Sequence, residues 1–305
     1  MTDYIVQRLG QALVVAVILS LVTFLLLFVA KDPARALASP DASAAEVELL
    51  RQRYGLDKPL PVQYFRWAVA AVQGDFGTSL FSRQPVSLLL APRIGATLQL
   101  ASFAILLTAL IGIPLGVLAA LKRGSFSDLI ASVIAVAGQA MPIFWFGLML
   151  IVLFAVQLGW LPVSGRGSWR HIILPGVTLA FSVLPLTMRL TRSAMLDVIS
   201  KDYVRTATAK GLERRKVVWK HAARNAATPV VLALGMQFGA LLGGTVVTET
   251  VFAWPGLGEL AVTSVSTADL PVVQAIVLFA AVVVVLSNLA ADVIVGLIDP
   301  RVRYY

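Results

Sequence analysis

The segment from Ser200 to Pro229 is the part of the chain whose residue types and spacing are best suited to recognition. It reads SKDYVRTATAKGLERRKVVWKHAARNAATP, and apolar stretches of membrane-spanning length flank it on both sides. Between Arg189 and Arg224, ten Lys or Arg residues accompany only three acids. Such a surface can bind lipid headgroups or enter a groove on a partner protein, and its charge alone fits either.

The remaining residue types give no catalytic constellation. The chain has no cysteine, which removes disulfides, thiolate metal sites and cysteine nucleophiles. Its two histidines, His171 and His221, are predicted on opposite sides of a membrane, so no metal site follows. The phosphate-binding, zinc-protease and nucleophile-elbow motifs are also missing from the sequence. We therefore predict a chain that is not an enzyme and that binds no cofactor or metal itself.

The composition is that of a membrane protein. Hydrophobic residues make up 58% of the 305 positions and charged residues only 13%, against about 25% in soluble domains. The net charge of +9 lies in short connections beside apolar runs, as expected for membrane topology rather than for nucleic-acid binding.

Six stretches have the roughly 20 apolar residues that a spanning helix needs. We expect an all-α integral membrane protein of six transmembrane helices, with residues 1–95 forming the first helix and a helical extracytoplasmic loop, and 96–300 a five-helix core. The first stretch is too long for a signal peptide, so we expect it to remain uncleaved. The predicted spans are Leu9–Ala30, Ala96–Leu121, Leu129–Leu158, Ile172–Leu190, Val230–Thr248 and Val272–Ile298.

The distribution of basic residues predicts the orientation. Lys122 and Arg123 follow the second span, and the ten basic residues described above follow the fourth. The connection from Glu249 to Pro271 has no Lys or Arg. The positive-inside rule therefore places both termini in the cytoplasm.

The first extracytoplasmic loop contains two helical signals. Ser43 and Glu46 have the spacing of a capping box. The aromatic run Tyr64–Trp67 suits a helix that lies in the membrane interface or caps the outer ends of the spans.

Small and polar residues mark the core. Gly112 and Gly116 favour helix packing, whereas the fifth span carries a glycine face that suits either packing or a translocation path. Prolines at 142, 175 and 185 are expected to interrupt the third and fourth spans. Asp292 lies at membrane depth, and we expect it to pair with Arg189 or Arg192. The candidate path residues are Gly235, Gln237, Gly239, Gly243 and Glu249.

The basic segment itself predicts two short helices. Ser200 or Asp202 is expected to cap the first, Tyr203–Lys210, and Gly211 to end it in a left-handed conformation. The second is expected over Leu212–Asn225, with Pro229 opening the fifth span.

The order of residues resembles a known family. Ala207-x-x-x-Gly211, followed by His221-Ala222-Ala223-Arg224-Asn225 and Pro229, is similar to the EAA loop of ABC importer permeases. Further similar stretches include Thr248–Gly258, Leu158–Pro162, Gly74–Leu80 and the tail Asp299-Pro300-Arg301. The chain most resembles the first permease of dipeptide and oligopeptide importers (the DppB/OppB type). Two departures, Arg205-Thr206-Ala207 for acid-Ala-Ala and the loss of Ile-x-Leu-Pro, are usual in that branch.

The resemblance implies a permease subunit in the cell membrane of a prokaryote. Its implied partners are a homologous second permease, two ATPase subunits that bind ATP and Mg, and an extracytoplasmic solute-binding protein. The implied cargo is a peptide, although relatives also carry nickel chelates, glutathione or haem. The implied ATPase-coupling residues are Tyr203, Arg205, Ala207, Lys210, Gly211, Leu212, Val217, His221, Arg224 and Asn225, and those contacting the binding protein are Phe252, Trp254, Pro255 and Gly256.

An ATPase-independent secondary transporter is the alternative from another class. It predicts midplane carboxylates for ion coupling and an inverted repeat, and the sequence offers neither.

Overall fold

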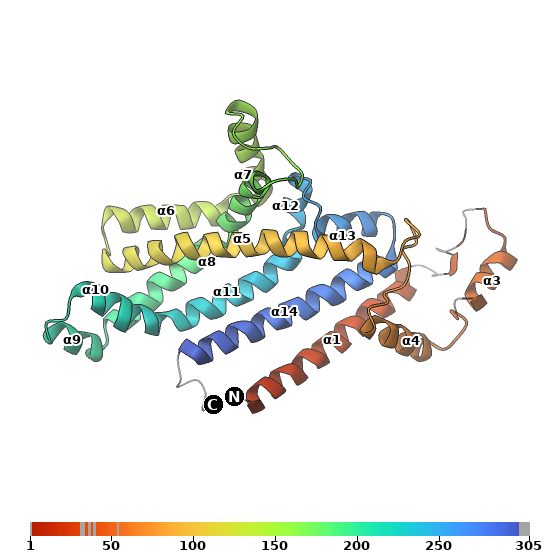
Figure 1. Ribbon diagram of the computed structural model, residues 1–305, viewed down its shortest axis with the longest axis horizontal. Helices are drawn as coiled ribbons and strands as arrows, with labels where there is room; N and C mark the ends of the chain where they lie inside the picture. Colours follow the sequence, from red (N-terminus) through yellow and green to blue (C-terminus); the bar gives the residue numbers. More distant parts are fainter. Residues whose placement is uncertain (1, 31–33, 36–37, 39–40, 54, 299–305) are drawn as a thin grey trace. The chain divides into compact units, whose positions relative to one another are not determined.

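The computed structural model describes residues 2–30, 34–35, 38, 41–53 and 55–298. Every element in this part of the chain is a helix, and its one β-bridge pairs Thr78 with Pro85 (Figure 1). This confirms the predicted all-α class. The helices are α1 Thr2–Ala30, α3 Ala44–Arg53, α4 Leu60–Val72, α5 Val86–Leu121, α6 Phe126–Ala140, α7 Ile143–Leu150, the π-helix η1 Ile151–Gln157, the 3-10 helix η2 Trp169–Ile172, α8 Ile173–Ile199, α9 Asp202–Ala209, α10 Arg214–Lys216, the π-helix η3 Val217–Ala223, α11 Arg224–Gly244, α12 Val246–Val251, α13 Leu257–Ser266 and α14 Leu270–Ile298.

Within the described residues, four helices are long and apolar enough to cross a membrane. They are Val86–Leu121, Trp169–Ile199, Arg214–Gly243 and Leu270–Gly296. A fifth span requires α6 and the α7–η1 segment to act together, and these are bent by 107°. Among the described side chains of α1, Leu13–Leu25 forms a shorter apolar helix.

The third span is therefore not the continuous helix that the sequence predicted over Leu129–Leu158. Proline has no backbone N–H and disfavours helical geometry in the residue before it. Met141 is accordingly extended, with φ −80° and ψ 128°, and α7 starts after Pro142. The expected interruption of the fourth span is wrong, because Pro175 lies in the first turn of α8 and the helix continues through Pro185.

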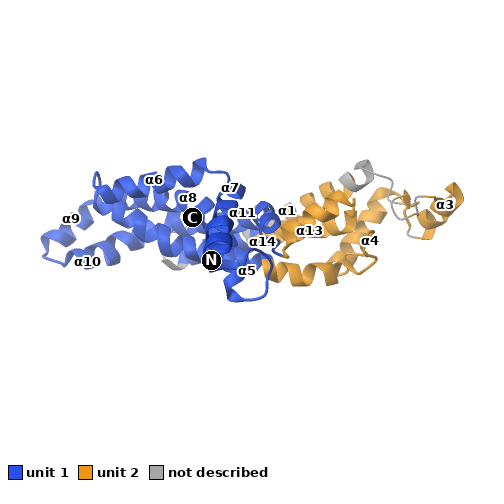
Figure 2. Cartoon of the chain, turned by 90° about the horizontal axis from the view of Figure 1, so that it is seen from above, with its two compact units in different colours: residues 1, 97–254, 284–305 blue, residues 2–96, 255–283 orange. Residues whose placement is uncertain are grey.

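The chain forms two compact units, coloured separately in Figure 2. Unit 1 comprises Thr97–Trp254 with the described part of Val284–Tyr305, and unit 2 comprises the described part of Thr2–Ala96 with Pro255–Val283. The predicted boundary between residues 95 and 96 lies one residue before the boundary between the two units, which falls between Ala96 and Thr97. Residues 255–283, which the sequence assigned to the core, belong to unit 2.

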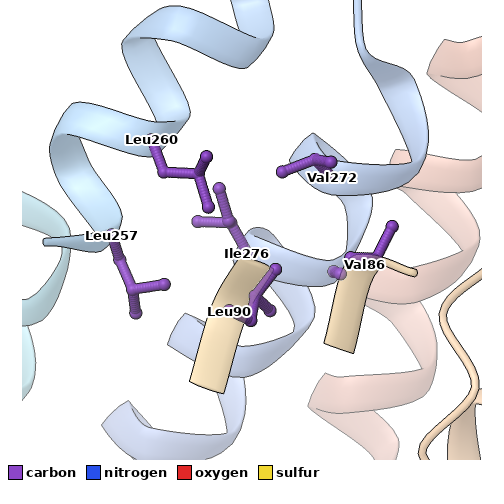
Figure 3. Close-up of a cluster of buried hydrophobic side chains, with 7 residues drawn as sticks. Val86, Leu90, Leu257, Leu260, Val272 and Ile276 are labelled. Carbon is purple, nitrogen blue, oxygen red and sulfur yellow. The ribbon is translucent and has the colours of Figure 1, made fainter. Parts of the chain in front are cut away.

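A hydrophobic cluster explains why these distant segments form unit 2. Val86 and Leu90 from the start of α5 pack with Leu257 and Leu260 of α13 and with Val272 of α14 (Figure 3). All five are buried, and apolar burial of this kind stabilises by about 1.5–3 kcal/mol per large side chain against water.

A buried carboxylate adds to the same unit. Asp269 accepts hydrogen bonds from the Ser79 hydroxyl and from the backbone N–H groups of Leu80, at 3.0 Å, and Phe81, at 3.4 Å. In the same unit, Arg93 of α5 forms an ion pair with Glu259 of α13. The Asp269 contacts hold the segment before α5 against the α13–α14 connection, and the ion pair joins α5 to α13.

The capping box predicted at Ser43 is confirmed. The Ser43 backbone N–H donates to Glu46 Oε2 at 2.7 Å, and the Glu46 N–H donates to Ser43 Oγ at 3.3 Å. Hydrogen bonds from the backbone and hydroxyl of Ser43 lower the pKa of Glu46. Of the two alternatives for Tyr64–Trp67, the structure favours packing on a span: Tyr64 lies edge-on to Phe24 of α1 at 5.4 Å, and Trp67 also contacts this ring.

In unit 1, the packing role predicted for the glycines of α5 is confirmed. A Cβ added at Gly116 would lie 2.7 Å from the Met188 carbonyl oxygen and 2.7 Å from Thr191 Cβ. A Cβ at Gly112 would lie 3.3 Å from Leu184 Cδ1. The absence of side chains at these positions lets α5 and α8 approach closely.

Gly116→Val should therefore prevent the packing of α5 on α8, because the neighbouring carbonyl cannot move without displacing the helix backbone. We expect loss of the monodisperse purified protein, or a clear drop in its thermal midpoint in detergent. Gly243→Val is the matched control, since nothing lies within 4 Å of a Cβ there. Equal stability of the two variants would contradict the close α5–α8 contact.

Candidate coupling site

The basic segment forms a helical hairpin at one end of the long helices of unit 1 (Figure 1). α8 ends at Ile199, α9 follows over Asp202–Ala209, and the returning helix begins at Arg214. The N-cap of α9 is Lys201, which has no side-chain cap bond, so the predicted capping by Ser200 or Asp202 is wrong. The Ser200 hydroxyl instead donates to the Asp197 carbonyl at the end of α8.

Gly211 ends α9 as the sequence predicted. Its φ is +77°, in the left-handed region that glycine adopts without steric cost. Its N–H donates to the Thr208 carbonyl at 3.0 Å, and the Leu212 N–H donates to the Ala207 carbonyl at 3.4 Å. This pair of bonds is a Schellman motif, which satisfies the last carbonyls of the helix and reverses the chain.

The second helix differs from its predicted form. It begins at Arg214, after Glu213 at the N-cap, and continues through η3 and α11 to Gly244. Pro229 lies inside α11 and does not separate the hairpin from the fifth span. The region Arg214–Gly243 is one helical rod, and it includes a π-helical stretch at Val217–Ala223.

A small apolar core closes the hairpin. Val204 and Ala207 of α9 pack with Val217 of the returning helix, and all three are buried. Val198 at the end of α8 packs against the same group. Ala207 and Val217, both predicted to contact a partner, therefore lie inside the hairpin, and their small volume sets the distance between its arms.

A polar contact ties the arms together on the surface. Asn225 Nδ2 donates to the Tyr203 hydroxyl at 2.8 Å and to the His221 carbonyl at 2.9 Å. Tyr203 and Asn225 are exposed, and His221 is half-buried. Arg205 pairs with Asp202 at 3.8 Å, but exposed pairs contribute only about 0–1 kcal/mol.

The surface that remains for a partner is basic with apolar patches. Trp219 is 54% exposed although it follows two buried valines, and the residue-type pattern did not single it out beforehand. Tryptophan is frequent among the residues that anchor protein interfaces, and its place among basic residues was the signal that the sequence offered. Besides Tyr203 and Asn225, the predicted coupling residues that are exposed here are Arg205, Lys210, Gly211, Leu212 and Arg224.

The predicted path residues of α11 are mostly packed within unit 1. A Cβ at Gly235 would lie 2.3 Å from Ala291 Cβ, and one at Gly239 would lie 3.3 Å from Val284 Cα, both on α14. Gly243 has open space beside it. The Gln237 amide and Thr187 Oγ1 lie within hydrogen-bonding distance, at 3.2 Å, and both residues are buried.

Glu249 and the residues after it are also interior. The Thr97 hydroxyl donates to Glu249 Oε1 at 2.7 Å, and Glu249 is fully buried. Phe252 packs against Ile151 and Leu174. Of the residues predicted to contact a binding protein, Phe252, Trp254 and Gly256 are buried, whereas Pro255 is exposed.

The loop between η1 and η2 covers these aromatic residues. The Gly165 N–H donates to the Phe252 carbonyl at 2.9 Å. The Arg166 guanidinium lies 5.8 Å from the centre of the Trp254 ring, and Arg166 also donates to Gln99 Oε1.

An ion pair that sequence reasoning missed joins α6 to α8. Arg192 donates through Nε to Asp128 Oδ1 at 2.8 Å and through Nη2 to Asp128 Oδ2 at 3.0 Å. Arg192, one of the two residues expected to pair with Asp292, is thus paired with Asp128. The tail residues Asp299, Pro300, Arg301 and Arg303 lie outside the described residues.

Comparison with known proteins identifies related chains. Residues 112–304 match the family described as the binding-protein-dependent transport system inner membrane component, and residues 1–101 match its N-terminal region. The chain is 45% identical over all 305 residues to the glutathione transport system permease protein GsiC of Salmonella paratyphi A (strain ATCC 9150 / SARB42), and 44% identical to that of Escherichia coli (strain K12). Both comparisons cover 100% of each chain.

Solved structures support the same fold. An inward-facing conformation of the MetNI methionine ABC transporter matches with a TM-score of 0.58 and 20% identity, over 70% of this chain and 97% of that one. An amino acid ABC transporter with histidines matches with a TM-score of 0.51 and 16% identity, over 70% and 94%.

Gly211→Val should loosen the hairpin, because a β-branched residue is strained at positive φ by about 1–2 kcal/mol. We expect amide hydrogen exchange in Asp202–Leu212 to become roughly 5- to 30-fold faster. The exposed neighbour substitution Ala209→Val is the control and should change exchange little. Unchanged exchange in Gly211→Val would contradict the left-handed turn.

Proposed function

The chain belongs to the family of binding-protein-dependent transport system inner membrane components and is a permease subunit of an ABC importer, and we propose that its cargo is glutathione or a short peptide of that kind. The observation that carries the cargo proposal is the 44–45% identity, over the full length of both chains, to proteins named as glutathione transport permeases. The family resemblance implied a peptide cargo and gave glutathione, itself a small peptide, only as an alternative; the proposal therefore moves from the general cargo to that alternative.

We propose that this chain is one subunit of a larger transport complex. A homologous second permease would complete the translocation pathway, two ATPases would bind ATP and Mg, and an extracytoplasmic protein would deliver the cargo. The family description supports the binding protein, and the fold shared with an ABC transporter supports the ATPases. ATP hydrolysis would then take place in the partner subunits.

We propose that the hairpin and both termini face the cytoplasm. The excess of basic residues between Arg189 and Arg224 supports this orientation, because such residues remain on the cytoplasmic side of short connections. The exposed basic surface around Lys210, Leu212 and Trp219 would then be available to an ATPase.

The hairpin geometry suggests how ATPase closure would move the spans. Its core joins Val198 at the end of α8 to Val217 in the rod that continues as α11. A force on the hairpin tip would therefore act on both spanning helices together, as a rigid-body motion. The path would lie along the part of α11 near Gly243, where neighbouring space is open.

The cargo proposal predicts ATP-dependent uptake of labelled glutathione by proteoliposomes that contain this chain with its second permease, ATPases and binding protein. Unlabelled glutathione should compete, and a panel of di- and tripeptides gives the range of cargo. Efficient uptake of other peptides with no glutathione uptake would overturn the specific cargo. Uptake by this chain alone, without ATP, would overturn its role as an importer subunit.

Leu212→Asp should weaken coupling, because it places an acid at the exposed hairpin tip without altering the buried core. We expect at least a tenfold loss of ATPase co-purification and of uptake, with unchanged membrane insertion. Val72→Asp is the matched control for co-purification, since Val72 is also exposed but lies in unit 2 on α4. Full assembly of Leu212→Asp would contradict the coupling assignment.

A further inference from the structure

A cavity of about 340 Å³ lies between α6 and α8, and no hairpin residue lines it. Ala131, Ala135 and Met188 form its apolar wall, while Ser132, Gln139, Arg189 and Arg192 contribute polar groups. Placing two arginines beside one cavity between membrane helices costs free energy unless an anion or water solvates their charges.

The two arginines differ in how they are held. Arg192 is fixed by the two-point contact with Asp128, and the Gly124 N–H supports the same carboxylate at 3.0 Å. The Nη1 group of Arg192 takes no part in that contact, so its N–H groups can donate to a bound anion. Among the described acids, none forms an ion pair with Arg189. Within the described residues, the Arg192 guanidinium is thus oriented and neutralised by Asp128, whereas Arg189, which is exposed at the mouth of the cavity, is paired with no described acid.

The depth of the cavity follows from the helices. Asp128 is the third residue of α6, which begins directly after the turn containing Lys122 and Arg123. Arg192, which pairs with Asp128, is level with this end of α6. Arg189 lies one turn deeper along α8, about 4.5 Å further from that end. In the orientation proposed above, the arginine end of the cavity faces the cytoplasmic headgroups, and the rest of the cavity extends along α6 to Gln139.

The rim of the cavity is apolar. Val136 lines it and is 66% exposed, and Val133 and Leu129 continue the same exposed face of α6 towards its start. A small soluble anion would leave this aliphatic face in contact with water. A phospholipid fits both the charged cavity and its apolar rim, because its phosphate can bind the arginines while its acyl chains cover the valines.

We propose that the α6–α8 cavity binds the phosphate of an anionic phospholipid from the cytoplasmic leaflet, with Arg189 as the principal ligand and Arg192 as the oriented second. Ser132 lines the same wall, and Gln139 lies about 10 Å further along α6, beside the part of the cavity that the acyl chains would enter. The bound lipid would fill the space between the first arm of the bent α6–α7 segment and α8. This inference rests on the proposed orientation but not on the identity of the cargo.

Native mass spectrometry of the purified full chain with added phosphatidylglycerol or phosphatidylcholine tests the site. We expect preferential retention of phosphatidylglycerol, and a loss of about tenfold or more in Arg189→Gln, as for removal of a charged hydrogen-bond donor. Lys122→Gln is the charge-matched control, because Lys122 is exposed at the same end but does not line the cavity. Ser132→Phe should also reduce retention by filling the cavity without changing charge.

Two results would overturn the proposal. Equal loss in Arg189→Gln and Lys122→Gln would show attraction to a basic surface rather than a site. Displacement of the lipid by soluble glycerol phosphate, or by glutathione, would assign the cavity to a soluble anion or to cargo. The lipid measurement does not require transport. If no lipid is retained but ATP-dependent uptake is intact, the proposed function stands without the lipid site. If lipid is retained but glutathione is not taken up, the lipid site stands without the proposed cargo.

Discussion

The packing of Ala207 and Val204 against Val217 is the contact that joins the ends of two long helices of unit 1 and on which the proposed coupling depends. It closes the hairpin between α8 and the rod that contains α11, and it does so with small side chains that bring the two arms together. Since Val198 joins the same core, the ends of two spanning helices share one apolar group. A partner that moves the hairpin therefore moves both helices.

Polar side chains inside the helical bundle strengthen this arrangement. Thr187 with Gln237, Thr97 with Glu249, and Arg192 with Asp128 each join different helices of unit 1. Buried polar groups in apolar surroundings are costly without partners, so each pair favours one specific helix register. The glycines of α5 and α11 also favour one register, because the helices pack so closely at Gly116 and Gly235 that they cannot slide past each other without steric clashes. Relative motion in transport would then occur between packed groups rather than within them.

Much of the fold follows from local sequence features. Apolar runs of spanning length locate the long helices, since every backbone polar group in hydrocarbon must be satisfied within the segment. Gly211 ends α9 because only glycine adopts a left-handed turn without steric cost, and Pro142 breaks the third span because it lacks an N–H. Pro229 shows the limit of such signals, since α11 accommodates it within a continuous helix.

The sequence by itself determined the all-helical membrane class, the hairpin with its turn, and, through its motifs, the permease family. The tertiary structure decided which residues face a partner and which face inward. It placed Ala207, Phe252 and Trp254 inside, paired Arg192 with Asp128, and grouped residues 255–283 with the N-terminal part. The physical reason is distance along the chain. These contacts join segments separated by ten to more than a hundred residues, and residue type and local spacing do not tell which distant side chain will fill a given space.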